Sequence, residues 1–212
     1  MFELEYKGAN CVIITTKKAK LVIDPKLSIV GLKDISTKDA IELVTESRFS
    51  TNNPDARLII DGAGEYGVAG LDIKGIACRK HIDDNDENMS STIYRLEIDG
   101  ARVGLIGNIY DKLSDEQLED LGLVDILIVP VGGNGYTLDA VEAAALVRMI
   151  DPKIVVPVHY ADSSINYEVP QDDIKLFISE LSAPVEQVLK YKLKQLPINQ
   201  TTLSIIELDR SK

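Results

Sequence analysis

Residues 125–133 read DILIVPVGG, residues 152–160 read PKIVVPVHY, and these two stretches decide the fold. Each contains a short run of apolar, mostly β-branched residues, which predicts a strand. The alanine-rich segment between them, from Leu138 to about Ile150, is predicted to be a helix because Thr137 can cap it and Asp151-Pro152 stops it. A strand, a helix and a second strand in this order indicate an α/β fold.

Similar apolar runs predict strands on both sides of these two stretches. The predicted strands are Phe2–Tyr6, Cys11–Thr16, Leu21–Ile23, Ile41–Val44, Leu58–Ile60, Leu71–Ala77, Thr92–Ile98, Val103–Ile106, Asp125–Val129, Ile154–Val158, Val188–Leu193 and Thr202–Leu208. Two more helices are predicted. One runs to about Leu121 from the capping-box pair Ser114 and Gln117, and the other spans roughly Gln171 to Leu181 with apolar residues at helical spacing.

The order of these elements predicts the architecture. A strand-rich first half is followed by helices inserted between strands, and the chain closes with a further strand. This order favours two mixed β-sheets packed face to face with helices outside, a four-layer αββα sandwich. No linker-like stretch separates two cores, so we expect a single domain over residues 1–212.

The composition is that of a soluble globular protein in a reducing compartment. Hydrophobic residues make up 45% of the chain and charged residues 27%. No apolar run approaches the ~20 residues of a membrane-spanning helix, and the first residues, MFELE, are acidic where a secretory signal would be basic. Only Cys11 and Cys78 are present, which favours buried reduced thiols over a disulfide framework. We expect a cytoplasmic protein with no membrane partner.

The charge narrows the class of partner. A formal net charge of -11 repels a phosphate backbone, and the paired basic residues Lys17-Lys18 and Arg79-Lys80 form no continuous stripe. Nucleic acid is therefore disfavoured as a partner. A small molecule, another protein or further copies of the chain stay open.

Four segments, in order, resemble the metallo-β-lactamase superfamily, and specifically the branch similar to ascorbate-phosphate lactonase and to uncharacterised zinc-dependent hydrolases. They are LVIDP at 21–25, IIDGAGEYGV at 59–68, DILIVPVGG at 125–133 with YTLDA at 136–140, and PKIVVPVHY at 152–160. The resemblance covers the chain from near its start to about residue 160. It implies the sandwich predicted above, and the ability of the family to hydrolyse substrates with bound metal.

The metal-binding motif of that family is substituted in this chain. In the family a His-x-His-x-Asp-His motif follows a strand that ends in threonine, and here Thr45 is followed by ESRFST. Glu46 takes the place of the first histidine, Arg48 the second, Ser50 the aspartate and Thr51 the last histidine. Arg48 has no lone pair to offer, and its permanent positive charge repels a dication.

The other ligand positions are partly retained. Gly107-Asn108 resembles the family's Gly-Asp pair, with an amide in place of the bridging carboxylate. His159 matches the last ligand histidine, and His81 falls with looser alignment near the middle one. These two histidines with Glu46 or Asn108 would supply a three-ligand site for one zinc or other divalent ion. Otherwise His159 is a hydrogen-bonded residue at a strand end and His81 an exposed loop residue.

A cluster without metal is the other interpretation of the same residues. Glu46, Arg48, Glu65 and Asn108 could meet His159 in the cleft, where Arg48 would pair with Glu46 or Glu65.

Three functions follow from these alternatives. The leading hypothesis is a non-catalytic binding or interaction module, a pseudoenzyme with a degenerate active site and no cofactor. The alternative is a metal-dependent hydrolase of a phosphorylated or lactone-like small molecule with a reduced one-metal site. In a third, Glu46 or Glu65 acts as a general base while Arg48 stabilises an anion without metal.

Overall fold

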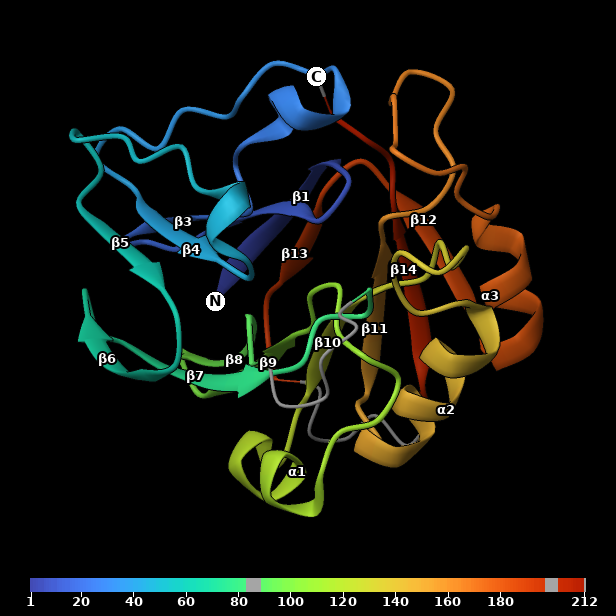
Figure 1. Cartoon of the computed structure of the whole chain (residues 1–212). Helices are drawn as coiled ribbons and strands as arrows, with labels where there is room; N and C mark the ends of the chain where they lie inside the picture. Colours follow the sequence, from blue (N-terminus) through green and yellow to red (C-terminus); the bar gives the residue numbers. More distant parts are fainter. Residues whose placement is uncertain (83–88, 197–201, 212) are drawn as a thin grey trace.

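The computed structural model describes residues 1–82, 89–196 and 202–211, and two β-sheets packed face to face form its centre (Figure 1). The first sheet is built mainly from the N-terminal strands. In spatial order its strands are β13 (Tyr191–Leu193), β1 (Phe2–Gly8), β2 (Cys11–Thr15), β3 (Lys20–Ile23), β4 (Ile41–Val44) and β5 (Leu58–Asp61). β3, β4 and β5 run parallel and the other neighbours antiparallel, so this sheet is mixed.

The second sheet is larger and also mixed. In spatial order its strands are β12 (Val185–Val188), β14 (Ser204–Leu208), β11 (Ile154–Val158), β10 (Ile126–Pro130), β9 (Ala101–Leu105), β8 (Ser91–Ile98), β7 (Leu71–Cys78) and β6 (Gly64–Val68). β12 through β9 are parallel, and β9 through β6 are antiparallel. Every residue of β10 and β11 is buried, because these parallel strands are covered on both faces.

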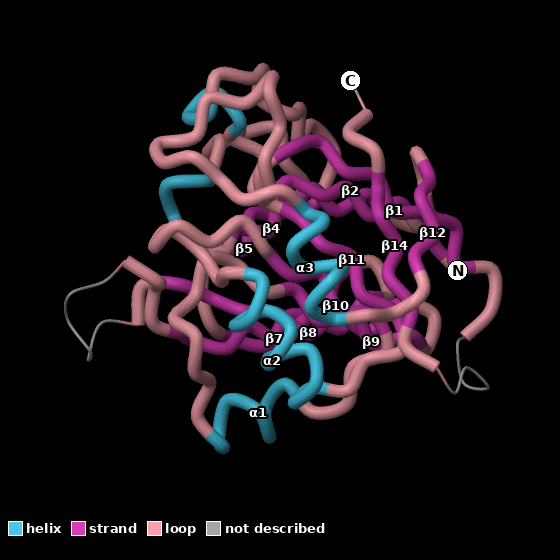
Figure 2. The backbone as a smooth tube through the Cα atoms, turned by 90° about the vertical axis from the view of Figure 1, so that its right-hand side faces the viewer, coloured by secondary structure: helices cyan, strands magenta, loops and turns pink. Residues whose placement is uncertain are grey.

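Helices cover the outer face of this second sheet. They are α1 (Asp115–Leu121), α2 (Ala140–Ile150) and α3 (Ile174–Leu181), and Figure 2 shows them in front of the strands of the sheet. The outer face of the first sheet is covered by the 3-10 helix η1 (Leu27–Val30) and by loop residues such as Ile165. The predicted sandwich is confirmed, with a 3-10 helix and loops as its outermost layer on the N-terminal side. No helix in the described ranges is long and apolar enough to cross a membrane.

The main core lies between the two sheets. Alternate residues of β1, namely Phe2, Leu4 and Tyr6, are buried in it, while Glu3 and Glu5 are partly exposed on the other face. This alternation is the two-residue period of a strand that is packed on one side only. Cys11 and Cys78 are both buried and unbridged.

The helix starts differ in part from the predictions. The capping box of Ser114 and Gln117 is present as predicted. However, α2 is capped by Asp139, whose carboxylate accepts hydrogen bonds from the amides of Val141 and Glu142, and not by Thr137. A carboxylate adjacent to the first turn satisfies two unpaired amides and the positive end of the helix dipole at once. For the same reason α3 starts after its cap Asp173, three residues later than predicted.

Two strand predictions were wrong. The stretch 188–193 was predicted as one strand, but the chain crosses between the sheets here, so that β12 ends at Val188 and β13 begins at Tyr191. No strand was predicted between Ile60 and Leu71, but Gly64–Val68 form the edge strand β6. Glycine inside a strand lowers its β propensity, so the local sequence does not mark these residues as a strand.

Candidate functional site

Loops at one edge of the sandwich bring the candidate residues together. Asp24 follows β3, Glu46 follows β4, Asn108 follows β9 and His159 follows β11. Each of these strands runs parallel to a neighbour in its sheet, so their carboxyl ends lie at a common edge. The carboxyl ends of parallel strands are the usual position of binding sites in α/β folds.

Glu46 is the buried acidic group at the centre of this site. Its side chain is 3% exposed, and the Nε of Arg48 lies 2.9 Å from its Oε2 atom. The Nζ of Lys80 lies 3.7 Å from the same oxygen, and the amide of Asn108 donates a 3.3 Å hydrogen bond to Oε1. Burial raises the pKa of Glu46, while Arg48 and Lys80 oppose that shift. The carboxylate is therefore held by two cations and an amide.

An amide relay continues from Asn108. The side-chain amide of Asn10 donates to Oδ1 of Asn108 over 3.0 Å, and both residues are buried. Gly107 is needed beside them, because a Cβ there would lie only 2.7 Å from Cβ of Thr45. The close contact between the two loops fixes Asn108 against Glu46.

Aromatic rings hold Arg48 from the other side. Its guanidinium carbon lies 4.7 Å from the centre of the Phe49 ring and 5.2 Å from that of Tyr136. Tyr136 in turn stacks on His159, at 5.4 Å between ring centres and 18° between planes, and His159 contacts Tyr167 at 4.8 Å. Stacking against aromatic faces favours a planar cation such as guanidinium. The pair Glu46–Arg48 is thus continuous with a column of rings that includes His159.

His159 is buried and neutral. Burial lowers its pKa to about 4, although a hydrogen bond to Gln171 acts in the opposite direction. The Nδ1 atom lies 3.1 Å from Oε1 of Gln171, whose amide nitrogen donates to the carbonyl of Val169. Because Gln171 presents its oxygen, Nδ1 carries the ring proton and Nε2 carries the lone pair.

The loop after Thr45 is anchored by a second buried carboxylate. Glu42 accepts hydrogen bonds from the hydroxyl of Ser50 at 2.6 Å, the amide of Thr51 at 2.7 Å and the hydroxyl of Thr51 at 2.6 Å. These bonds hold the pKa of Glu42 below its usual value in spite of its burial. Ser50 and Thr51 are therefore occupied with Glu42 rather than with the groups around Glu46.

Asp24 fixes the other end of the same loop. Its carboxylate accepts hydrogen bonds from the amide of Thr45 at 2.8 Å and from the hydroxyl of Thr45 at 2.6 Å. Burial raises the pKa of Asp24 to about 7, although both bonds from Thr45 lower it. Asp24 and His159 both have positive φ, at 44° and 52°, which turns the chain sharply at the end of each strand.

The structure unites most of the predicted site residues. Glu46, Arg48 and Asn108 are in contact, and His159 joins them through Tyr136. His81 lies at the margin, where its amide donates to the carbonyl of Asn108 at 3.0 Å and its Nδ1 lies 3.1 Å from the carbonyl of Ile109.

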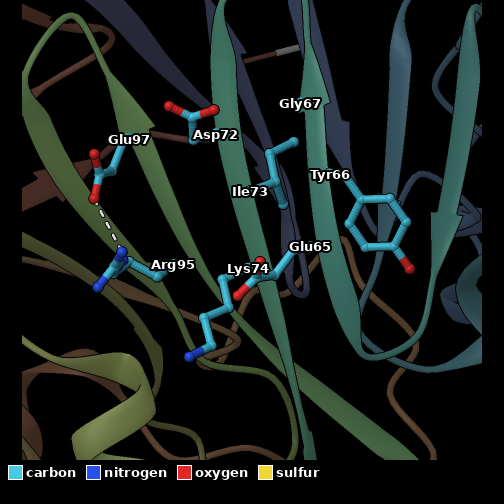
Figure 3. Close-up of a pocket in the computed structure, with 8 residues that line it drawn as sticks. All are labelled: Glu65, Tyr66, Gly67, Asp72, Ile73, Lys74, Arg95 and Glu97. Carbon is cyan, nitrogen blue, oxygen red and sulfur yellow. Dashed lines mark hydrogen bonds and ion pairs between the residues drawn. The ribbon is translucent and has the colours of Figure 1, made fainter.

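Glu65 does not join this cluster, contrary to the prediction. It is exposed on β6 and lines a separate hollow with Lys74 and Arg95 (Figure 3). The reason is that residues 64–68 form a strand, which carries Glu65 onto the outer face of the second sheet.

Several site residues were missed by the sequence reasoning. Asn10, Lys80 and Gln171 contact the cluster from segments without a recognisable motif, and no local signal marks them. Glu42 could have been found, since a carboxylate inside the apolar run of β4 needs hydrogen-bond partners. In the described part of the chain, no three His, Cys, Asp or Glu side chains are placed to hold a metal ion together.

Comparisons with known proteins agree with the fold. A family model described as the beta-lactamase superfamily domain matches residues 3–159. A relative from Natranaerobius thermophilus, named a metal-dependent hydrolase, is 26% identical over 81% of this chain and 87% of its own length. Another of that name, from Thermococcus onnurineus, is 28% identical over 61% of this chain, and the match spans only 56% of that protein.

Solved structures show the same architecture. A protein of the metallo-beta-lactamase superfamily from Thermotoga maritima has a TM-score of 0.77 at 20% identity, with 99% of this chain and 100% of that chain covered. A metallo hydrolase from Ignicoccus hospitalis has a TM-score of 0.66 at 17% identity, with 91% and 99% covered. The family match covers most of the sequence and these folds superpose over nearly the whole chain, so the chain belongs to the beta-lactamase superfamily and has the metallo-beta-lactamase fold.

Proposed function

We propose that this chain is a metal-free, non-catalytic member of its family that acts as a binding or interaction module through the site around Glu46 and Arg48. One observation carries the proposal. The Arg48 guanidinium lies 2.9 Å from Glu46, the one strong ligand type left in the substituted motif. A cation supplied by the chain itself thus compensates the carboxylate that a metal would otherwise contact.

The chemistry of the remaining groups does not fit a metal centre. A divalent ion needs several lone pairs directed to one point, and Arg48 offers a positive charge and none. Ser50 and Thr51 bond to Glu42, and Asn108 brings no charge. A pair of metal ions needs anionic ligands to offset the repulsion between them, which Glu46 would have to supply, since Asp24 is bonded to Thr45.

The ligand class that suits this site is a small anion, a carboxylate or a phosphate ester. Two cations, Arg48 and Lys80, contact the buried carboxylate of Glu46, and their side chains keep 33% and 28% of their surface exposed. The stacked guanidinium is a planar fork of the kind that binds carboxylate and phosphate in bidentate fashion. The negative charge of the exposed Glu168 also raises the pKa of Arg48. An incoming anion therefore competes with Glu168 for the guanidinium.

Metal analysis of the purified chain tests the proposal. Protein prepared without chelator is measured by inductively coupled plasma mass spectrometry, and then titrated with zinc, manganese and ferrous ions by calorimetry. We expect far less than one metal ion per chain and no tight binding. Stoichiometric metal bound at high affinity would overturn the proposal.

The runner-up is a metal-dependent hydrolase with one metal, and the names of the relatives favour it. His159 and His81 would supply two ligands, with Glu46 or Asn108 as a third. This function requires metal-stimulated cleavage of a phosphodiester, lactone or thioester test substrate that His159→Ala abolishes. If no metal stimulates cleavage of any of these substrates, the hydrolase is excluded as the function of this site.

A further inference from the structure

The free edge of the second sheet lies away from the site around Glu46 and Arg48. Among the described residues β6 pairs with β7 alone, and the two strands are joined by a two-residue hairpin at Ala69 and Gly70. Both turn residues have positive φ, 54° and 74°, as the tight hairpin geometry requires. In such a hairpin the flanking pair, Val68 and Leu71, exchanges backbone hydrogen bonds, and every second pair does so after it.

This register determines which backbone groups face outward. Val68, Tyr66 and Gly64 bond to β7, so Gly67 and Glu65 direct their amides and carbonyls away from it. Within the described residues no other backbone hydrogen bond is made by Glu65 or Gly67. The edge therefore presents the backbone amides and carbonyls of Glu65 and Gly67. Their spacing suits hydrogen bonds to an antiparallel strand.

The side chains beside this edge are acidic. Glu65 stands on the edge strand, and Asp72 lies directly behind Gly67 on β7. No ion pair or hydrogen bond to either carboxylate is found in the described parts of the chain, and both are exposed. By contrast, Lys74 is paired with Asp120 at 2.6 Å and Arg95 with Glu97 at 3.0 Å. The carboxylates of Glu65 and Asp72 therefore place negative charge beside Gly67.

Gly67 forms a gap in the edge strand. A Cβ built on it would meet nothing closer than Oδ1 of Asp72, at 4.0 Å. A long side chain from an added strand can pass over Gly67 to reach Asp72. An open hollow of about 450 Å³ adjoins this position, lined by Glu65, Gly67, Asp72 and their neighbours, and Figure 3 shows Tyr66 on the opposite side of the strand from Lys74 and Arg95.

We propose that β6 is a docking edge for an extended segment of a partner protein in which basic and apolar residues alternate. The segment adds antiparallel to β6, through the backbone groups of Glu65 and Gly67. One basic side chain pairs with Glu65, and the next, two residues away, crosses Gly67 to Asp72. The apolar residues between them face the side of Tyr66 and Val68, which pack against the core.

The probe is a short, terminally blocked, fluorescein-labelled peptide of alternating lysine and valine, titrated with the full chain and followed by fluorescence anisotropy. Binding should be lost when glutamate replaces the lysines of the peptide. It should also be lost when the peptide amides that would bond to β6 are methylated. The double variant Glu65→Lys/Asp72→Lys should weaken the Kd about tenfold, since each exposed ion pair contributes several-fold. Gly67→Val should also weaken it, because the gap is filled.

Glu186→Lys is the matched control. It makes the same charge change as Glu65→Lys alone, but on the exposed face of β12, the other edge of the same sheet, and should leave the Kd unchanged. Equal weakening by Glu186→Lys, or equal binding of the methylated peptide, would reduce the interaction to non-specific charge attraction and overturn the proposal.

A second copy of the chain is the competing occupant. Residues 190–194 read KYKLK and alternate in the way the edge requires. If sedimentation shows self-association that both Gly67→Val and Lys192→Glu abolish, the edge binds another copy and the proposed partner is wrong. A monomer that binds the lysine peptide supports the proposal.

Discussion

Nε of Arg48 lies 2.9 Å from the carboxylate of Glu46, whose side chain is 3% exposed, so each of the two side chains compensates the charge of the other. Among the described residues, replacing Arg48 by alanine leaves this buried carboxylate with Lys80, at 3.7 Å, as its one cationic partner. We expect Arg48→Ala to lower the free energy of unfolding by about 3 kcal/mol, the lower end of the range for removing one partner of a buried ion pair, because Arg48 is partly exposed. Urea denaturation measures this change.

A double-mutant cycle separates charge from packing. Glu46→Gln removes the charge and keeps an oxygen for the amide of Asn108, so Glu46→Gln/Arg48→Ala should be more stable than Arg48→Ala alone. If the two single changes simply add, Arg48 contributes only through its contacts with the Phe49 and Tyr136 rings.

Restoring ligands should restore metal binding, if substitution is what removed it. The variant Glu46→His/Arg48→His/Asn108→Asp returns two imidazoles and a carboxylate to a site that already contains His159. We expect this triple variant to bind zinc in calorimetric titration while the wild-type chain does not. Glu46→His/Asn108→Asp, which keeps the Arg48 guanidinium in place, is the control and should bind zinc far more weakly. Equal zinc affinity in the two variants would show that Arg48 is no obstacle to a metal.

Asp24 should make stability fall as the pH rises toward neutrality. Its pKa is raised by burial to about 7, against 3.8 in an exposed aspartate, so the folded chain holds a proton that the unfolded chain releases. Stability from this group is complete below pH 3.8 and is lost as the pH rises through 7. His159, with its pKa lowered to about 4, acts in the opposite sense between pH 4 and 6.5.

The two effects still overlap near pH 6.5, where an unfolded histidine is half protonated, and Asp24→Asn separates them because it removes the titration of Asp24 alone. Between pH 6.5 and 8 the free energy of unfolding should decrease with a slope of at most about 1.4 kcal/mol per pH unit, and Asp24→Asn should flatten it. The control is Asp39→Asn, at an exposed aspartate, which should leave the slope unchanged. An unchanged slope in Asp24→Asn would mean that another group titrates in this range.

The parts of the fold that could be predicted from the sequence depend on local patterns. The buried runs at Ile126–Pro130 and Ile154–Val158, and the capping box at Ser114, are fixed by residues close together in the chain. The crossing between the sheets after Val188 and the edge strand at Gly64–Val68 are not. The crossing and the edge strand both depend on which strand from a distant part of the chain pairs with these residues. The local sequence does not determine that pairing.

The site divides in the same way. Glu46, Arg48, Asn108 and His159 lie at strand ends, which the order of apolar runs locates. What each residue contacts depends on loops from distant parts of the chain, so the amide of Asn10 and the ring of Tyr136 could not be assigned. The position of Glu65 was predicted wrongly because residues 64–68 form a strand. This strand places the Glu65 side chain on the outer face of the second sheet and away from Glu46.

The position of His159 should depend on the absence of a side chain at Gly132. A Cβ built on Gly132 would collide with the carbonyl oxygen of His159 and with Oε1 of Gln171, the oxygen that accepts from the His159 ring. Gly132→Ala must therefore push apart the loops after β10 and β11. We expect it to lower the free energy of unfolding by about 1–3 kcal/mol, the range for overpacking, and to shift the His159 ring signals in an NMR spectrum. The control is Gly67→Ala, where the nearest atom to the new Cβ is Oδ1 of Asp72, at an unstrained 4.0 Å, and the change should stay within about 0.5 kcal/mol. If both substitutions have the same small effect, the loops around His159 are loosely packed, and the ring column from Arg48 to Tyr167 is not a rigid unit.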